Sequence, residues 1–220
     1  HGFNLEGEID VKELNKSGKV DRTVRRIRWE RVGGRIAEQA KRGQFGTVKL
    51  LIDSDGDGRM DKAHVWADRL PPCYGMLPLR DGLVVVCAPD ILFLADRDGD
   101  GRAEVRETLL TGFRREFIER GINNPRWGLD NWIYVGSGGD GGTIRGPHLK
   151  TPVKLGRTDF RIKADGSAIE PVTGTVRTFG WGMNATGDRF TTAGGTPVSA
   201  NLPLPYRYLG RNPFVASPAV

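Results

Sequence analysis

The stretch Asp96-Arg-Asp-Gly-Asp-Gly-Arg-Ala-Glu104 decides the fold, because a near copy, Asp53-Ser-Asp-Gly-Asp-Gly-Arg-Met-Asp61, stands 43 residues earlier. In each copy, carboxylates occupy positions 1, 3, 5 and 9, and glycine occupies position 6. A tight loop of this composition directs several hard oxygen atoms at one centre, as a calcium ion requires. The repeat therefore predicts two calcium loops.

The segments on either side of the loops indicate strands rather than helices. An EF-hand loop would carry a bidentate Glu at position 12, but His64 stands there in the first copy and Glu107 in the second. The flanking runs 47–52, 63–66, 91–95 and 105–110 are short, apolar or β-branched, and bounded by turn residues. We therefore expect each loop at the tip of a β-hairpin.

The expected ligands of each ion are four carboxylates and the backbone carbonyl at position 7. They are Asp53, Asp55, Asp57, Asp61 and the carbonyl of Arg59 in the first loop, and Asp96, Asp98, Asp100, Glu104 and the carbonyl of Arg102 in the second. The alternative is a pair of plain turns, because Asp and Gly both tolerate the left-handed backbone that hairpins need. Without a cation, however, the clustered carboxylates would repel one another.

Composition favours an all-β protein with no nucleic-acid partner. The 220 residues include 31 Gly and 13 Pro, with short apolar runs and no long helical period. Residues 1–50 hold 12 Lys or Arg against 7 Asp or Glu, so +5 of the net charge of +6 lies there. The remainder is nearly neutral and has no basic groove interleaved with aromatic residues, which argues against nucleic-acid binding. No run approaches the roughly 20 apolar residues of a membrane span.

The chain begins with His1 and carries no signal peptide, so we expect either a removed leader or a piece of a longer chain. Cys73 and Cys87 lie 14 residues apart. A disulfide in an oxidising compartment and a pair of buried thiols both fit this spacing. The absence of a Cys-x-x-Cys motif leaves zinc and covalently attached haem without a basis in the sequence.

Two regions are expected, a basic and poorly patterned extension or insertion over 1–44 and a β domain over 45–220. The arginine cluster between Arg22 and Arg35, around Trp29, favours a solvated hairpin or an insertion over an anionic-surface contact. The β domain repeats a unit of short strands. The expected strands are 66–70, 75–79, 83–88, 91–95 and 105–110, then 124–128, 132–135, 159–163 and 168–172, then 178–183 and 189–192.

Four-stranded units of 40 to 50 residues are typical of β-propeller blades. A β-sandwich would also use short strands, but it would not repeat an ion loop at a fixed offset. We therefore expect an all-β fold, a partial β-propeller of four-stranded blades with about three to four blades in this chain. Because a propeller needs at least four blades to close, the expected partners are the remaining blades or domains of a longer chain.

From about Gly43 to Pro213 the sequence resembles the propeller domain of the planctomycete and verrucomicrobial large membrane-bound dehydrogenase-like family, distantly similar to soluble quinoprotein glucose dehydrogenase. The sequence segments that carry the resemblance are 48–58, 88–94, 105–113, 126–134, 156–161 and 208–213. The resemblance implies export across the inner membrane, to the periplasm or the cell surface. It also implies, in many members, downstream helical-repeat and cytochrome c domains.

The same resemblance raises pyrroloquinoline quinone (PQQ) as a cofactor. A sugar-oxidising quinoprotein needs a general base, and in the glucose dehydrogenases a His precedes the strand that corresponds to 125–127. Here the preceding stretch 119–124 has no His, and we expect His64 and His148 to be surface residues. No catalytic base is therefore evident.

A cofactor or ligand loop is expected at Gly138–Gly142, where related quinoproteins carry a Gly-Asp loop. Its candidate binding residues are Asp140, Arg145, Asn123 and Asn124. The alternative is a flexible turn.

Two functions remain. The first is a calcium-stabilised extracytoplasmic propeller that binds a glycan, a small sugar or a protein partner, with Trp127, Trp132 and Trp181 available for stacking or for the core. The second is a PQQ-dependent sugar or alcohol dehydrogenase, which rests on family analogy alone. We favour the first, because the ion loops are visible in the sequence and a catalytic set is not.

Overall fold

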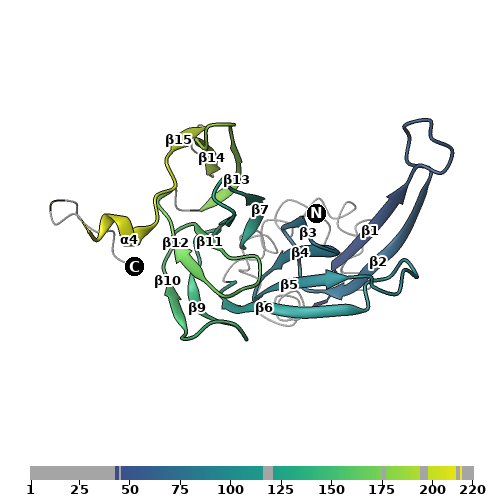
Figure 1. The fold of residues 1–220 in the computed structure, drawn as a ribbon, viewed down its shortest axis with the longest axis horizontal. Coiled ribbons are helices and arrows are strands. Elements are labelled where there is room, and N and C mark those ends of the chain that lie inside the picture. The colour runs from purple at the N-terminus through teal and green to yellow at the C-terminus, as the bar shows by residue number, and fades with distance from the viewer. Residues whose placement is uncertain are drawn as a thin grey trace, which may run out of the picture.

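The structure is a computed structural model that describes residues 43–44, 46–115, 121–174, 177–193, 198–211 and 214. In this part of the chain, strands form four antiparallel sheets and the one α-helix is the short α4 (Tyr206–Leu209) (Figure 1). The expected all-β class is confirmed, and none of the four sheets is closed on itself. The expectation for the basic N-terminal region lies outside the described residues, apart from 43–44.

The first sheet is a two-stranded arm formed by β1 (Gly46–Ile52) and β2 (Lys62–Leu70). Only its base is buried, at Val48, Ala67 and Leu70. The far end extends away from the other sheets and carries the first acidic loop at its tip (Figure 1).

The second sheet contains the centre of the hydrophobic core. Its strands, in spatial order, are β10 (Val153–Leu155), β9 (Gly142–Arg145), β6 (Val105–Phe113), β5 (Asp90–Ala95), β4 (Gly82–Cys87) and β3 (Gly75–Leu79). Along β4, Val84 and Val86 belong to one buried cluster, whereas Val85 and Cys87 belong to another. Because side chains alternate between the faces of a strand, this sheet is covered on both sides.

The two covering layers come from different parts of the chain. The base of the β1–β2 arm packs on one face through Val48, Ala67 and Leu70. The third sheet packs on the other face, and the rings of Phe113 and Phe160 stack there with centroids 5.2 Å apart. Each fully buried side chain of this size contributes about 1.5–3 kcal/mol.

The third sheet has the order β12 (Ile169–Pro171), β11 (Phe160–Ile162), β8 (Ile133–Gly136), β7 (Asn123–Trp127). The fourth sheet consists of β13 (Thr178–Met183), β14 (Arg189–Ala193) and β15 (Ser199–Asn201). Strand β7 contacts β3 of the second sheet and β13 of the fourth. The first strands of three successive units therefore lie next to one another.

The predicted strands are present, and both acidic loops connect the two strands of an antiparallel hairpin, as expected. The Gly-rich segment after β8, for which the sequence predicted a ligand loop or a flexible turn, also forms part of a sheet. It leads into β9, which pairs with β6 and with β10 in the preceding sheet. The sequence hides this strand because its glycines lack the β-branched side chains that mark strands.

Cys73 and Cys87 are both free thiols, and both pack in the buried cluster between the arm and the second sheet. Contact with Cys73 and burial raise the pKa of the Cys87 thiol. The protein therefore contains the thiol pair rather than the disulfide at this position.

A buried ion pair joins the third and fourth sheets. The side chains of Asp159 and Arg189 are fully buried, with Oδ2 of Asp159 2.5 Å from Nη2 of Arg189. The same carboxylate accepts hydrogen bonds from the Ser137 N–H and the Thr178 hydroxyl. The guanidinium also lies 4.6 Å from the centroid of the Trp181 ring. Burial lowers the pKa of Arg189, and the Asp159 carboxylate opposes this shift.

We predict that Arg189→Met lowers the free energy of unfolding by about 3–5 kcal/mol, because it leaves the buried Asp159 carboxylate without a counter-charge. Urea unfolding followed by circular dichroism measures the loss. The matched control is Arg97→Met, which removes a solvent-exposed arginine 2.9 Å from Asp81 and is expected to change little. Equal effects of the two substitutions would contradict the prediction.

Candidate functional site

The first acidic loop is folded around its own carboxylates. Asp53 accepts the backbone N–H groups of Gly56 and Gly58, both at 2.8 Å. Asp57 accepts the N–H of Arg59 at 2.7 Å, and Asp55 accepts that of Asp57 at 3.3 Å. The backbone of the loop is therefore held by the side chains that were predicted to be ligands.

The second loop repeats these bonds position by position. Asp96 accepts the N–H groups of Gly99 at 2.8 Å and Gly101 at 3.0 Å. Asp98 accepts the N–H of Asp100 at 3.1 Å, and Asp100 accepts that of Arg102 at 2.7 Å. Two loops with the same sequence pattern thus have the same local structure.

Glycines at positions 4 and 6 permit this backbone. The φ angles are 77° at Gly56 and 86° at Gly58, and 76° at Gly99 and 87° at Gly101. A Cβ atom on Gly56, Gly58 or Gly99 would meet no other atom within 4 Å. The left-handed backbone alone, and not a lack of space, favours glycine at those three positions.

Each loop brings three carboxylates together. One oxygen each of Asp53, Asp55 and Asp57 lies within 4.8 Å of the others, and the same holds for Asp96, Asp98 and Glu104. Two oxygens that share a calcium ion at about 2.4 Å can be at most about 4.8 Å apart. Both sets are thus compact enough to hold one cation, and hard carboxylate oxygens suit calcium.

The two loops differ at position 9. Asp61 accepts the N–H of Ser54 at 2.9 Å and also its hydroxyl, and it lies outside the compact set. Glu104 accepts the N–H of Arg97 at 3.0 Å and belongs to its compact set, from which Asp100 is left out. Asp61 and Asp100 therefore lie outside the compact sets, and the ligand roles of all the predicted residues remain predictions.

The electrostatics favour ionised carboxylates. The backbone N–H groups of Gly58 and Gly56 lower the pKa of Asp53, and the Ser54 hydroxyl and N–H lower the pKa of Asp61. A lowered carboxyl pKa stabilises the fold above the usual value of 3.8, and this contribution is lost as the pH falls through the lowered value. At neutral pH Asp53 and Asp61 of the first loop are therefore negatively charged.

The two loops are connected through His64, which follows the first. Its ring is half-buried, and Nε2 lies 3.0 Å from the carbonyl oxygen of Gly101 in the second loop. His64, expected as a surface residue, is thus only partly exposed and makes a long-range contact. His148 is exposed, as expected.

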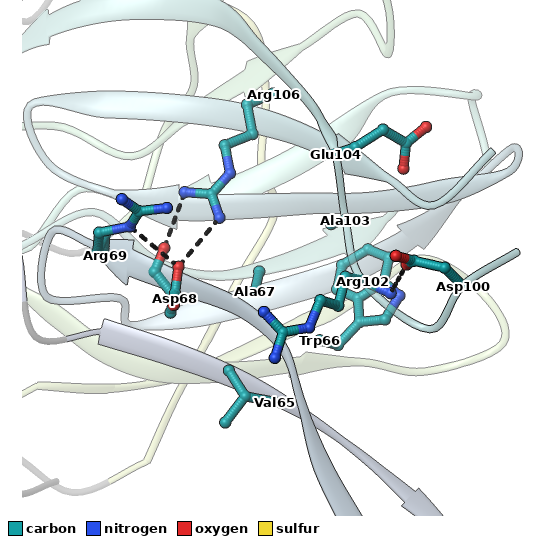
Figure 2. A pocket seen from close by; sticks show the side chains of 10 residues that line it. All are labelled: Val65, Trp66, Ala67, Asp68, Arg69, Asp100, Arg102, Ala103, Glu104 and Arg106. Atoms are coloured by element: carbon teal, nitrogen blue, oxygen red, sulfur yellow. Dashed lines mark hydrogen bonds and ion pairs between the residues drawn. The ribbon is translucent and has the colours of Figure 1, made fainter. Parts of the chain in front are cut away.

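A pocket of about 350 Å³ lies beside the second loop (Figure 2). One wall is β2, and the other is the end of the loop and the start of β6. Its lining residues are Val65, Trp66, Ala67, Asp68, Arg69, Asp100, Arg102, Ala103, Glu104 and Arg106. Sequence analysis did not predict this pocket, because its two walls are separated by about 30 residues in the chain.

The four predicted cofactor-binding residues do not form one exposed surface. Asp140 and Asn123 are buried, Asn124 is half-buried and Arg145 is exposed on β9. The Asn123 amide donates to the carbonyls of Gly121 and Thr178, and the Asn124 amide donates to that of Trp181. Both asparagines thus bind the backbone, and binding of PQQ by this group remains a prediction.

The Gly-rich loop at Gly138–Gly142, expected to bind a cofactor or ligand, is buried and packs against the backbone of other segments. A Cβ atom on Gly138 would lie 2.4 Å from the carbonyl oxygen of Gly121, and one on Gly142 would lie 2.2 Å from that of Gly112. Both have positive φ angles, 64° and 153°. The glycines therefore serve a close approach between backbones.

Of the three tryptophans considered for sugar stacking, two belong to the interior. Trp132 and Trp181 are 8% and 5% exposed, and the guanidinium groups of Arg161 and Arg189 lie 4.3 Å and 4.6 Å from their ring centroids. Trp127 is 41% exposed.

Comparison with known proteins identifies the family. A family model described as a domain of unknown function, DUF7133, matches residues 30–220. The chain belongs to the DUF7133 family. No curated protein and no solved structure matches the chain. The DUF7133 match spans both acidic loops and every described strand.

The described part of this DUF7133 chain contains no helix with the length and apolar character of a membrane span.

We predict that Gly99→Ala destabilises the protein by about 1–2 kcal/mol, because alanine resists the left-handed backbone at this position. Gly99→Asn, which tolerates that conformation better, should cost less. Thermal unfolding in the presence of chelator compares the two variants without a contribution from bound metal. A larger loss for Asn than for Ala would contradict the assignment of the cost to the backbone.

Proposed function

We propose that the chain is a calcium-stabilised β-propeller module, acting outside the cytoplasm as a binding or scaffold part of a larger dehydrogenase-like protein. The observation that carries the proposal is the acidic hairpin loop, which is built twice with the same hydrogen bonds. In each loop three carboxylate oxygens lie close enough to share one ion. Such a cluster of negative charge is stabilised by a divalent cation.

The arrangement of the strands supports the propeller part of the proposal. Strands β3 to β6 form an antiparallel meander, and β7, β8, β11 and β12 form another four-stranded unit. The second and third sheets are stacked face to face, and β7 contacts both β3 and β13. In a propeller the first strands of successive blades approach one another around a central axis in this way.

The extracytoplasmic location and the dehydrogenase-like context rest on the sequence resemblance. A scaffold or binding role is favoured over catalysis because the chain offers two ion loops and no evident general base. His64, which follows the first loop, lies within hydrogen-bond distance of the Gly101 carbonyl.

Calcium should raise the melting temperature of the protein. A ligand that binds only the folded state at a hundredfold excess over Kd adds about 2.7 kcal/mol. For a domain of this size that corresponds to about 5–10 °C. The double variant Asp55→Ala, Asp98→Ala should lose most of this gain, because it removes one carboxylate from each compact set.

Differential scanning calorimetry in millimolar calcium and in excess chelator measures the effect. The matched control is Asp165→Ala, which removes an exposed aspartate that accepts the N–H of Ser167 but belongs to neither compact set. This variant should retain the calcium response. Equal melting temperatures in calcium and in chelator for the unmodified protein would contradict the proposal. The two loops would then be plain turns that bind no calcium.

The enzymatic alternative has its own test. We predict that the chain, supplied with PQQ, calcium and an aldose, does not reduce an artificial electron acceptor, because the stretch 119–124, where the resemblance places the general base, contains no His. A dye-reduction assay is the measurement. Turnover that Asp140→Ala abolishes would contradict the prediction and favour a dehydrogenase.

A further inference from the structure

Three contacts between β2 and the segment from Gly101 to Arg106 fix the relative position of the walls of the pocket beside the second acidic loop. The Ala103 N–H donates to the Trp66 carbonyl at 2.7 Å, and the Arg106 guanidinium donates to the Asp68 carbonyl at 2.8 Å. His64 meets the Gly101 carbonyl beside them. The walls are thus fixed by the protein itself, and the volume of about 350 Å³ lies in the range of small-ligand sites.

The charges that line the pocket are unequally compensated. Asp68 is shared by Arg69 and Arg106, each with a nitrogen 3.3 Å from Oδ1. Asp100 accepts the backbone N–H of Arg102, and Glu104 accepts that of Arg97. Each carboxylate of the lining therefore has a hydrogen-bond donor within the protein.

Arg102 differs from the other charged residues of the lining because its side chain has no partner in the described part of the chain. Its guanidinium makes no hydrogen bond or ion pair with any residue that the structure describes. In Figure 2 the side chain extends over β2 toward Val65 and Ala67, away from the Asp100 carboxylate. The pocket thus contains a cationic group that is available to a ligand.

Beside this cation the lining is aromatic and apolar. The half-buried Trp66 contributes to the pocket wall, together with Val65 and Ala67. An aromatic side chain stacks well on the apolar face of a pyranose ring, and a guanidinium binds a carboxylate through charge-assisted, bidentate hydrogen bonds. One ligand class, a carboxylated sugar, satisfies both groups together.

We propose that this pocket binds a carboxylated sugar residue, with Arg102 holding the carboxylate and Trp66 the face of the ring. The contacts that fix its walls are protein contacts, so the proposal does not require a bound cation. The first acidic loop provides an internal comparison. Arg59 occupies the same position in that loop as Arg102 does in the second, and it lines no part of this pocket.

Isothermal titration calorimetry of the full chain with D-galacturonate, D-galactose and acetate tests the proposal. D-galactose lacks the carboxylate, and acetate lacks the ring. Galacturonate should bind saturably, and each of the other two at least about tenfold more weakly. Each titration is run in calcium and again in chelator, and saturable galacturonate binding in either supports the pocket.

The variants separate this site from a general charge effect. Arg102→Gln should abolish the preference for galacturonate over galactose, and Arg59→Gln should preserve it. Trp66→Leu should weaken the binding of both sugars, while circular dichroism reports whether each variant keeps its fold. Absence of saturable galacturonate binding in both calcium and chelator overturns the proposal. Equal losses for Arg59→Gln and Arg102→Gln, or acetate binding as tight as that of galacturonate, overturn it as well.

Discussion

The constraint on which the described fold depends is that β4 and β5 are apolar on both faces. Val84 and Val86 enter one buried cluster while Val85 and Cys87 enter another, so this sheet needs a layer on each side. The base of the β1–β2 arm covers one face, and β8 and β11 cover the other through Ile133, Val135, Phe160 and Ile162. Because burial of apolar area is the main favourable term in folding, the order of the sheets follows from this one requirement. The arm can extend into solvent because only its base is needed for covering.

The contact between the third and fourth sheets is of a different kind. Asp159 and Arg189 are fully buried there, and the asparagine amides of β7 donate to carbonyls of β13. A buried ion pair gives little net stability over an apolar pair of similar size, since desolvation offsets the attraction. Hydrogen bonds do, however, demand one relative position. We infer that the polar groups set the register between these sheets, while the apolar clusters supply the stability.

The sequence predicted what is local and repeated. The acidic loops and most strands could be recognised because turn residues and β-branched runs determine backbone conformation over a few residues. The pairing of β9 with β6 could not, since it depends on glycines that let backbones approach closely, as Gly142 does beside Gly112. The roles of Asn123 and Asn124 could not be predicted either. The sequence alone does not distinguish an asparagine whose amide donates to the backbone of a neighbouring strand from one that binds a ligand. The pocket was missed for a similar reason, as its walls meet only after the hairpins have folded.

The two acidic loops show how one local structure acquires different surroundings. Their shared hydrogen bonds all lie within each loop, so the same nine-residue pattern folds in the same way at the tip of an exposed arm and beside a packed sheet. Only the second loop touches another element of the described chain through His64 and through the Ala103 N–H. A cation in the first loop would therefore order a hairpin tip, whereas one in the second would also brace the junction between the arm and the second sheet. Glu104 belongs both to the acidic set of the second loop and to the pocket lining, whereas no carboxylate of the first set lines the pocket.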